Sequence, residues 1–329
     1  MELTVVKNPQ VKQQEEFTEF ELLSTSKAFI EANTIESNLN EIRAGHIIPV
    51  FIKDNEPVIS QAEFIQSALD MVADVYHGET ILKPNVRLSH PIKGRIPEAK
   101  LKPANQLLEH EKTLYYERMA FVVEVPSIFS EINGNRINLT IGGVKAYNLD
   151  NLYNKSGADQ HFKIFVGFQN KVCTNLCVST DGLLSSLKVK NLDNLRNAIR
   201  MLLQDFDALQ FATNLKELHN YQLTEPQFAQ LIGRCRMYKY LPELQQADIP
   251  QLMFGESQLN TVCNDYFRDK AFCRSDDGTI NLWNLYNLFT GSNKSSYIDT
   301  FLDRGVNAYD LAITLKEALD NRQGCWFLN

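Results

Sequence analysis

The dipeptide Asn133-Gly134, set between two long apolar runs, constrains the fold more than any other feature of this sequence. The runs are MAFVVEVPSIFSEI at 119–132 and RINLTIGGVKAY at 136–147. Asparagine and glycine both tolerate a positive φ angle, which the two-residue turn of a tight β-hairpin requires. The pattern therefore predicts an antiparallel hairpin in the middle of the chain.

Two further runs extend this hairpin into a sheet. HFKIFVGFQ (161–169) alternates regularly, and VCTNLCVS (172–179) follows across a tight turn as its antiparallel partner. The four runs together predict an antiparallel β-meander. The pair Gly142-Gly143 predicts a bulge or a sharp bend in the second strand.

The segments before and after the meander have other patterns. Before it, the sequence predicts a mobile or extended leader (1–26), a short helix (35–45), an edge strand (46–52) and a helix that begins after Ser60 and ends at Gly78. After it, helical periodicity predicts helices at 191–209, after Thr224, and at about 255–268, 279–290, 294–304 and 307–320.

This order of elements indicates an α+β fold. We expect an antiparallel β-meander core with N-terminal α/β elements and a mostly helical C-terminal half. The expected parts are the leader at 1–26, an α+β region with the antiparallel sheet at 27–185, and a helical region packed on it at 186–329.

Composition and charge exclude several classes of protein. The net charge of −7 argues against binding of polyanions by bulk electrostatics. No run approaches the roughly 18–20 apolar residues of a membrane span, and the N-terminus does not resemble a signal peptide. We therefore expect a cytoplasmic protein with no membrane partner, whose six cysteines are free thiols. Scattered cysteines and histidines predict no metal site, and the absence of common nucleotide and hydrolase motifs implies no cofactor.

Charge is unevenly distributed along the chain. Residues 1–82 carry 5 Lys/Arg and 14 Asp/Glu, whereas residues 83–118 carry 8 and 4. The centre of the basic part, LKPNVRLSHPIKGRIPEAKLKP (82–103), contains four prolines, which exclude a regular helix through most of it. An extended loop here could bind phosphates, pair with the acidic N-terminal segment, or simply be solvated. The binding candidates are Arg87, His90, Lys93, Arg95, Lys100 and Lys102.

Cys173 and Cys177 are spaced four residues apart, which raises the question of a metal or redox pair. On a strand, residues i and i+4 lie about 13 Å apart at roughly 3.3 Å per residue, too far for a disulfide. Packing is therefore the favoured interpretation of both thiols. If this stretch contributes to a pocket, Asn175 and Asp181 are better candidates than either thiol.

The segment NLWNLYNLFTGSNKSSY (281–297) combines apolar residues around the whole helix with regularly spaced polar ones. The apolar residues predict deep burial, and buried amides must be hydrogen-bonded. Asn287, Thr290 and Lys294 share a stripe with Trp283 and Tyr286. They could form a structural network that holds neighbouring loops, or the polar wall of a pocket.

Several long motifs resemble a bacterial family, the domain-of-unknown-function family 3871. They are SHPIKGRIPEA (89–99), LTIGGVKAYNLDNLY (139–153), FKIFVGFQNKVCTNLCVSTDG (162–182), NLWNLYNLFT (281–290) and CWFLN (325–329). More distantly, two motifs resemble a phage- and plasmid-associated family of unknown function, family 932. They are the hairpin with Cys173-Thr-Asn175 and Asp181-Gly182, and the helix with Trp283, Tyr286, Asn287 and Thr290. The resemblance implies a bacterial cytoplasmic protein linked to mobile elements, and it implies no activity and no catalytic residues.

The leading hypothesis is an accessory protein of a mobile element that binds nucleic acid, or another protein of the same element, through the 83–102 segment. A second hypothesis is an enzyme of unrecognised class with a cleft between the sheet and the helical half. A third is a structural or assembly protein. The sequence does not decide whether the chain is an enzyme.

Overall fold

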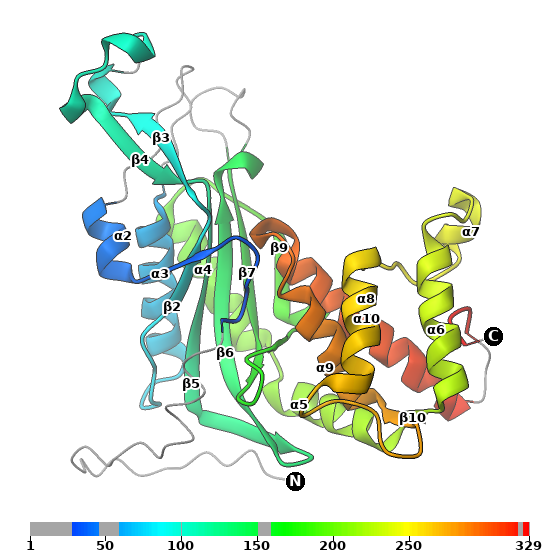
Figure 1. The fold of residues 1–329 in the computed structure, drawn as a ribbon. Coiled ribbons are helices and arrows are strands. Elements are labelled where there is room, and N and C mark those ends of the chain that lie inside the picture. The colour runs from blue at the N-terminus through cyan, green and yellow to red at the C-terminus, as the bar shows by residue number, and fades with distance from the viewer. Residues whose placement is uncertain (1–27, 46–58, 100, 151–158, 322–324, 329) are drawn as a thin grey trace.

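The computed structural model describes residues 28–45, 59–99, 101–150, 159–321 and 325–328, and these form an α+β fold. A long, twisted antiparallel sheet stands beside a group of helices from the C-terminal half (Figure 1). The expected fold class is confirmed. The leader at 1–26 and the strand at 46–52 lie outside the described residues.

The central hairpin forms as the sequence predicts. Strands β5 (Arg118–Ile132) and β6 (Asn135–Ala146) pair antiparallel, and Ile132 is opposite Asn135. The two turn residues between them have φ angles of 48° at Asn133 and 73° at Gly134. Both angles lie in the left-handed region that this turn needs.

Five more strands complete this sheet, in the order β1-β2-β5-β6-β7-β8, with β9 also paired to β7. Their bounds are β1 (Ile35–Ser37), β2 (Asn85–Leu88), β7 (Gln160–Asn170), β8 (Leu176–Cys177) and β9 (Leu183–Val189). The strand expected at 172–179 is therefore wrong over most of its length. Residues 171–173 form a turn and Thr174 has a φ angle of 60°, so a strand begins only at Leu176.

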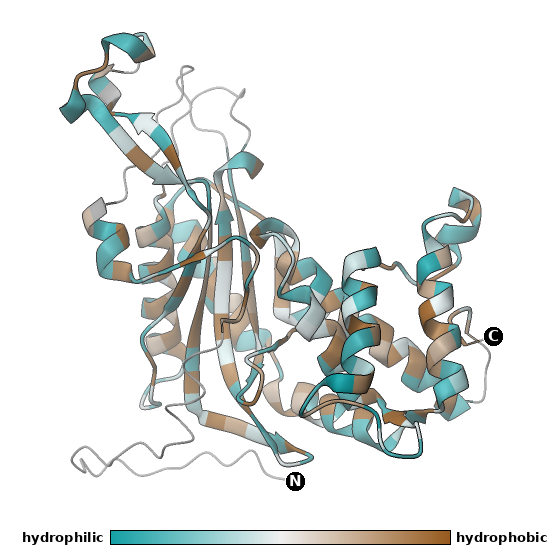
Figure 2. Ribbon diagram, viewed as in Figure 1, coloured by the Kyte–Doolittle hydropathy of each residue, from teal (hydrophilic) through white to brown (hydrophobic). Residues whose placement is uncertain are grey.

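Both faces of the sheet are buried. Because side chains alternate along a strand, one face packs on α3 (Gln61–Val75) and α4 (Leu192–Asp205). The other face packs on residues 29–30 and on the first turns of α10 (Ile298–Asn321). Figure 2 shows the apolar residues that this burial requires along the central strands.

Gly142 and Gly143 do not mark a bulge, because the pairing of β6 with β5 is continuous there. The irregularity lies instead in β5, between Val125 and Phe129. The glycines permit close approach. A Cβ on Gly142 would lie 2.1 Å from the carbonyl oxygen of Phe121, and one on Gly143 would lie 2.5 Å from the ring of Phe64.

The C-terminal half is helical, with differences in the boundaries. Its elements are α5 (Ala208–Glu217), α6 (Glu225–Tyr238), α7 (Glu243–Ala247), α8 (Glu256–Arg268), α9 (Leu282–Asn293) and α10, with the short strands β10 (Gln222–Leu223) and β11 (Ile280–Asn281). The helix expected at 191–209 is two helices, α4 and α5, because the chain turns at Phe206. The helices expected at 294–304 and 307–320 are one continuous helix, α10.

The N-terminal elements follow the sequence with one correction. The capping box at Ser60 forms and begins α3, and Gly78 follows that helix with a φ angle of 87°. In the stretch expected to be a helix at 35–45, the first three residues form β1, and α2 (Leu39–Gly45) occupies the rest.

The contact between Phe64 and Gly143 can be tested by a single substitution. Gly143→Ala should lower the free energy of unfolding by about 1–3 kcal/mol, because the added methyl group overpacks the interface between α3 and β6. Urea denaturation measures the change. The control is Gly233→Ala in the exposed interior of α6, where an added Cβ meets nothing within 4 Å. That variant should be slightly more stable than the wild type, and equal effects of the two substitutions would contradict the packing argument.

Candidate functional site

The basic segment is not the extended loop that its composition suggested. Its first part is β2, inside the main sheet, and its second part is β3 (Pro91–Arg95). Strand β3 pairs with β4 (Lys112–Tyr116) in a separate two-stranded sheet. The resulting β3–β4 arm, residues 91–116, projects from the end of the main sheet (upper left in Figure 1).

The structure separates the five described basic candidates into three groups. Arg87 lies in β2 and donates hydrogen bonds to the hydroxyl and carbonyl oxygens of Thr34, so its guanidinium joins β2 to the N-terminal segment. His90 is exposed just before the arm. The remaining described candidates, Lys93, Arg95 and Lys102, lie on the arm, whereas Lys100 lies outside the described residues.

The register of the arm places basic residues on one face. Lys93 is opposite Leu114, and Arg95 is opposite Lys112. Directly opposed residues of an antiparallel pair point to the same side, as do residues two apart on a strand. Lys93, Arg95 and Lys112 therefore share one face, and Lys112 is a member of it that the sequence did not single out.

Carboxylates offset part of this charge at the outer end of the arm. The Lys102 ammonium pairs with Glu111 and lowers the pKa of that carboxyl, and Lys112 does the same to Glu109. Lys93 forms no ion pair with any described residue. The pair of Lys112 with Glu109 is exposed, so it should exchange readily with solvent and ligands.

Three leucines on the arm are exposed to solvent. Leu101 is 78% exposed, Leu108 is 54% exposed and Leu114 is 49% exposed. Figure 2 shows hydrophobic segments among hydrophilic ones along the arm. The arm thus combines cations with unburied apolar side chains.

The second set of candidates is centred on the buried side chain of Asn287 in α9. Its Oδ1 accepts hydrogen bonds from Asn170 Nδ2 at 3.2 Å and from the Cys173 thiol at 3.7 Å. Its Nδ2 donates to the carbonyl oxygen of Trp283 at 2.9 Å. Its backbone carbonyl accepts from Asn175 Nδ2, also at 2.9 Å. The amide therefore holds the turn between β7 and β8 against α9.

Lys294 and Thr290 belong to the same contact region. The Lys294 ammonium donates to the carbonyl oxygen of Cys173 and to the hydroxyl of Thr174, the residue with a positive φ angle. The Thr290 hydroxyl donates back to the carbonyl of Tyr286 in its own helix. Four of the five pocket candidates therefore lie together, namely Asn175, Asn287, Thr290 and Lys294. Their side chains form hydrogen bonds with other groups of the protein.

Asp181 lies elsewhere. It lines a cavity of about 240 Å³ between the turn before β9 and the helices α5 and α10. Asp205 and Asp207 line the same cavity. Within the described residues, no three His, Cys, Asp or Glu side chains are grouped so that they could hold a metal ion.

The two cysteines pack as side chains of the core. Cys177 is fully buried, and burial raises the pKa of its thiol. Cys173 packs against the same core and donates to Asn287. The packing interpretation agrees with these contacts, although the strand geometry from which it was argued is wrong.

A buried ion pair is present that the sequence did not reveal. The side chain of Lys145 is 0% exposed, and its ammonium lies 2.7 Å from Asp150 and 4.2 Å from the centre of the Phe162 ring. Burial lowers the pKa of Lys145 to about 8, despite the opposing effect of Asp150. Asp150 also accepts a hydrogen bond from the backbone N–H of His161 at 2.8 Å, so the pair fixes the start of β7. The sequence signal that could have revealed this ion pair is a lysine within the apolar strand segment 136–147.

The Asn287 network gives a clear expectation for stability. Asn287→Ala should lower the free energy of unfolding by about 3 kcal/mol, because the buried side-chain amide of Asn170 loses its hydrogen-bond acceptor. The matched control is Asn284→Ala in the same helix, whose side chain makes one long hydrogen bond of 3.4 Å. Chemical denaturation should show a smaller loss for the control. Similar losses for both variants would contradict a central role for Asn287.

The buried pair of Lys145 and Asp150 predicts that substitutions of the two residues have non-additive effects on the free energy of unfolding. Lys145→Met should cost about 3–5 kcal/mol of unfolding free energy, because the carboxylate of Asp150 stays buried without its counterion. The double variant Lys145→Met, Asp150→Asn removes that charge and should be more stable than the single variant. Urea denaturation of the two proteins measures the difference, and no recovery in the double variant would exclude an uncompensated charge as the cause.

Comparisons with known proteins give one match. The family described as "Domain of unknown function, B. Theta Gene description (DUF3871)" matches residues 14–328. No curated protein and no solved structure matches the chain. No helix among the described residues is long and apolar enough to cross a membrane. Because the match extends over nearly the whole sequence, the chain belongs to the DUF3871 family.

Proposed function

We propose that this protein binds nucleic acid through the β3–β4 arm. The observation that carries the proposal is the cross-strand register, which places Lys93, Arg95 and Lys112 on one face of a projecting two-stranded ribbon. A ribbon of this kind is narrow enough to enter the major groove of B-DNA, which is about 12 Å wide. Cations on its outer face would then meet phosphates.

The charge distribution supports a local rather than a global interaction. The whole chain carries a net charge of −7, so attraction must come from a basic surface held away from the acidic parts. Projection of the arm from the body provides that separation (Figure 1). Lys93 has no competing carboxylate among the described residues, and the exposed pair of Lys112 with Glu109 can open at little cost.

The exposed leucines add a second kind of contact. Leu114 lies directly opposite Lys93 on the basic face, at 49% exposure. An apolar side chain between cations can contact sugars or base edges, including the methyl group of thymine. In this proposal the cations set affinity and the leucine contributes to positioning. Such a protein would act as an accessory factor of a mobile element, as the resemblance to family 932 implies.

The test is binding of fluorescein-labelled single-stranded and double-stranded DNA, measured by anisotropy at several salt concentrations. The wild type should bind at low salt and weaken as salt rises, because bound phosphates release counterions. Lys93→Glu combined with Lys112→Glu should weaken binding by about tenfold or more. The double substitution should also reduce the slope of log K against log salt by about 1 for each lost phosphate contact.

A charge-matched control separates the arm from general electrostatics. Arg268→Glu combined with Lys270→Glu changes the net charge by the same amount at two exposed positions of the helical half. This control should bind DNA almost as the wild type does. The proposal is overturned if the wild type does not bind at low salt, or if both double variants lose affinity equally.

A further inference from the structure

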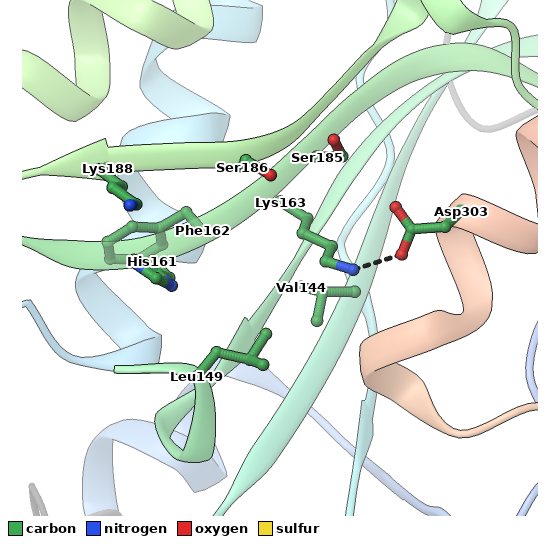
Figure 3. A pocket seen from close by; sticks show the side chains of 9 residues that line it. All are labelled: Val144, Leu149, His161, Phe162, Lys163, Ser185, Ser186, Lys188 and Asp303. Carbon is green, nitrogen blue, oxygen red and sulfur yellow. Dashed lines mark hydrogen bonds and ion pairs between the residues drawn. The ribbon is translucent and has the colours of Figure 1, made fainter. Parts of the chain in front are cut away.

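A cavity of about 370 Å³ opens on the sheet face on which α10 packs. It lies where β7, β9 and the first turns of α10 meet (Figure 3). Its walls carry basic groups, hydroxyl groups and apolar side chains. The lining residues that matter here are His161, Lys163, Ser185, Ser186, Lys188 and Leu149.

An irregularity in the sheet shapes this cavity. Phe162 pairs with Leu187 and Ile164 pairs with Leu184, so Lys163 alone is opposite two residues, Ser185 and Ser186. This is a β-bulge in β9. In a regular strand, neighbouring side chains point to opposite faces, but here both serines line the cavity. Bulges are common beside functional sites, where they redirect side chains.

Two basic side chains stand directly opposite each other at the same place. His161 of β7 pairs with Lys188 of β9, and Figure 3 shows the two side chains close together. The ammonium of Lys188 is therefore opposite an imidazole and not opposite a carboxylate. Burial lowers the pKa of His161, and Lys188 lowers it further. Lys188 is exposed and forms no ion pair within the described chain.

Most of the other charged groups around His161 pair with one another and not with Lys188. Lys163 pairs with Asp303 and donates to the carbonyl of Asp299, so those groups satisfy each other. Lys145 and Asp150 form their own pair on the opposite face of the sheet, where Lys145 lowers the pKa of His161 and Asp150 raises it. Asp159, two residues before His161, also raises that pKa. Among the described residues, Lys188 is the lysine of the cavity lining that forms no ion pair.

We infer that this cavity binds the phosphate group of a small phosphorylated organic molecule. Lys188 and His161 would hold the phosphate oxygens, and the hydroxyls of Ser185 and Ser186 would donate hydrogen bonds to them. A phosphate would supply the anionic partner that Lys188 lacks among the described residues, and the imidazole of His161 could donate a hydrogen bond to it. Charge-assisted hydrogen bonds of this kind are roughly twice as strong as neutral ones.

The size and lining of the cavity indicate a ligand larger than an inorganic phosphate ion. A volume of about 370 Å³ lies within the range of small-molecule sites. Val144 and Leu149 form an apolar wall on the side of β6, opposite the serines. A phosphomonoester with an apolar or flat organic part would contact both sides. A mononucleotide is the simplest probe with this chemistry.

The experiment is calorimetric titration of the full chain with adenosine 5′-monophosphate, adenosine and inorganic phosphate. We expect the monophosphate to bind, inorganic phosphate to bind more weakly, and adenosine not to bind measurably. Lys188→Ala should weaken binding of the monophosphate by about tenfold or more, because a charged hydrogen bond is lost. His161→Gln should weaken it less, since glutamine retains a donor.

Lys190→Ala is the matched control, since Lys190 is an exposed lysine two residues beyond Lys188 that does not line the cavity. It should leave the affinity unchanged. Thermal melting of both alanine variants checks that each is folded. Three outcomes would overturn the inference: no binding of either phosphate probe, equal binding of adenosine and its monophosphate, or equal losses for Lys188→Ala and Lys190→Ala.

This inference does not depend on the proposed function of the arm. The substitutions Lys93→Glu and Lys112→Glu are in β3 and β4, which do not line the cavity. The variant that carries them should therefore bind the monophosphate normally. Conversely, Lys188→Ala should not change binding of DNA to the arm. A shared loss in both assays would instead assign the cavity to the nucleic-acid site and overturn its role in binding a small molecule.

Discussion

The side-chain amide of Asn287 is the interaction on which the joining of the two halves depends. It lies on α9, in the helical half, and it accepts hydrogen bonds from Asn170 and Cys173 at the turn that connects β7 to β8. Thr174 within this turn has a positive φ angle, and the Lys294 ammonium is bonded to its hydroxyl. A sheet edge and a buried helix are thus connected by directional hydrogen bonds, which fix their relative position more specifically than apolar packing alone.

The surfaces proposed to bind ligands are found where regular structure is interrupted. The central strands of the main sheet are buried on both faces. The β3–β4 arm leaves that sheet altogether, and the bulge in β9 turns Ser185 and Ser186 toward one cavity. The buried pair of Lys145 and Asp150 supports the same region from behind, because Asp150 holds the backbone of His161. The regular core is rigid, whereas the arm and the bulge expose polar groups that a ligand can reach.

Local sequence signals predicted the elements that local chemistry controls. The Asn133-Gly134 turn, the capping boxes at Ser60 and Thr224 and the deep burial of α9 were all predictable, because each depends on residues close together in the chain. The pairing partner of a strand depends on distant residues. For this reason the sequence predicts a loop for the basic segment, although β3 finds its partner in β4. It likewise predicts a bulge or a sharp bend at Gly142-Gly143, although Gly143 accommodates Phe64 of α3.

By itself the sequence determined the α+β class, the central hairpin and the polar character of the stripe on α9. Hydrophobic periodicity and turn chemistry suffice for these features, because they act over a few residues. Only the tertiary structure decided that four of the pocket candidates bond to the fold and one another, that Lys112 joins Lys93 and Arg95 on one face, and that His161 meets Lys188. Each of these results depends on strand register or on long-range packing, and a shift of one residue in register would place every side chain on the other face.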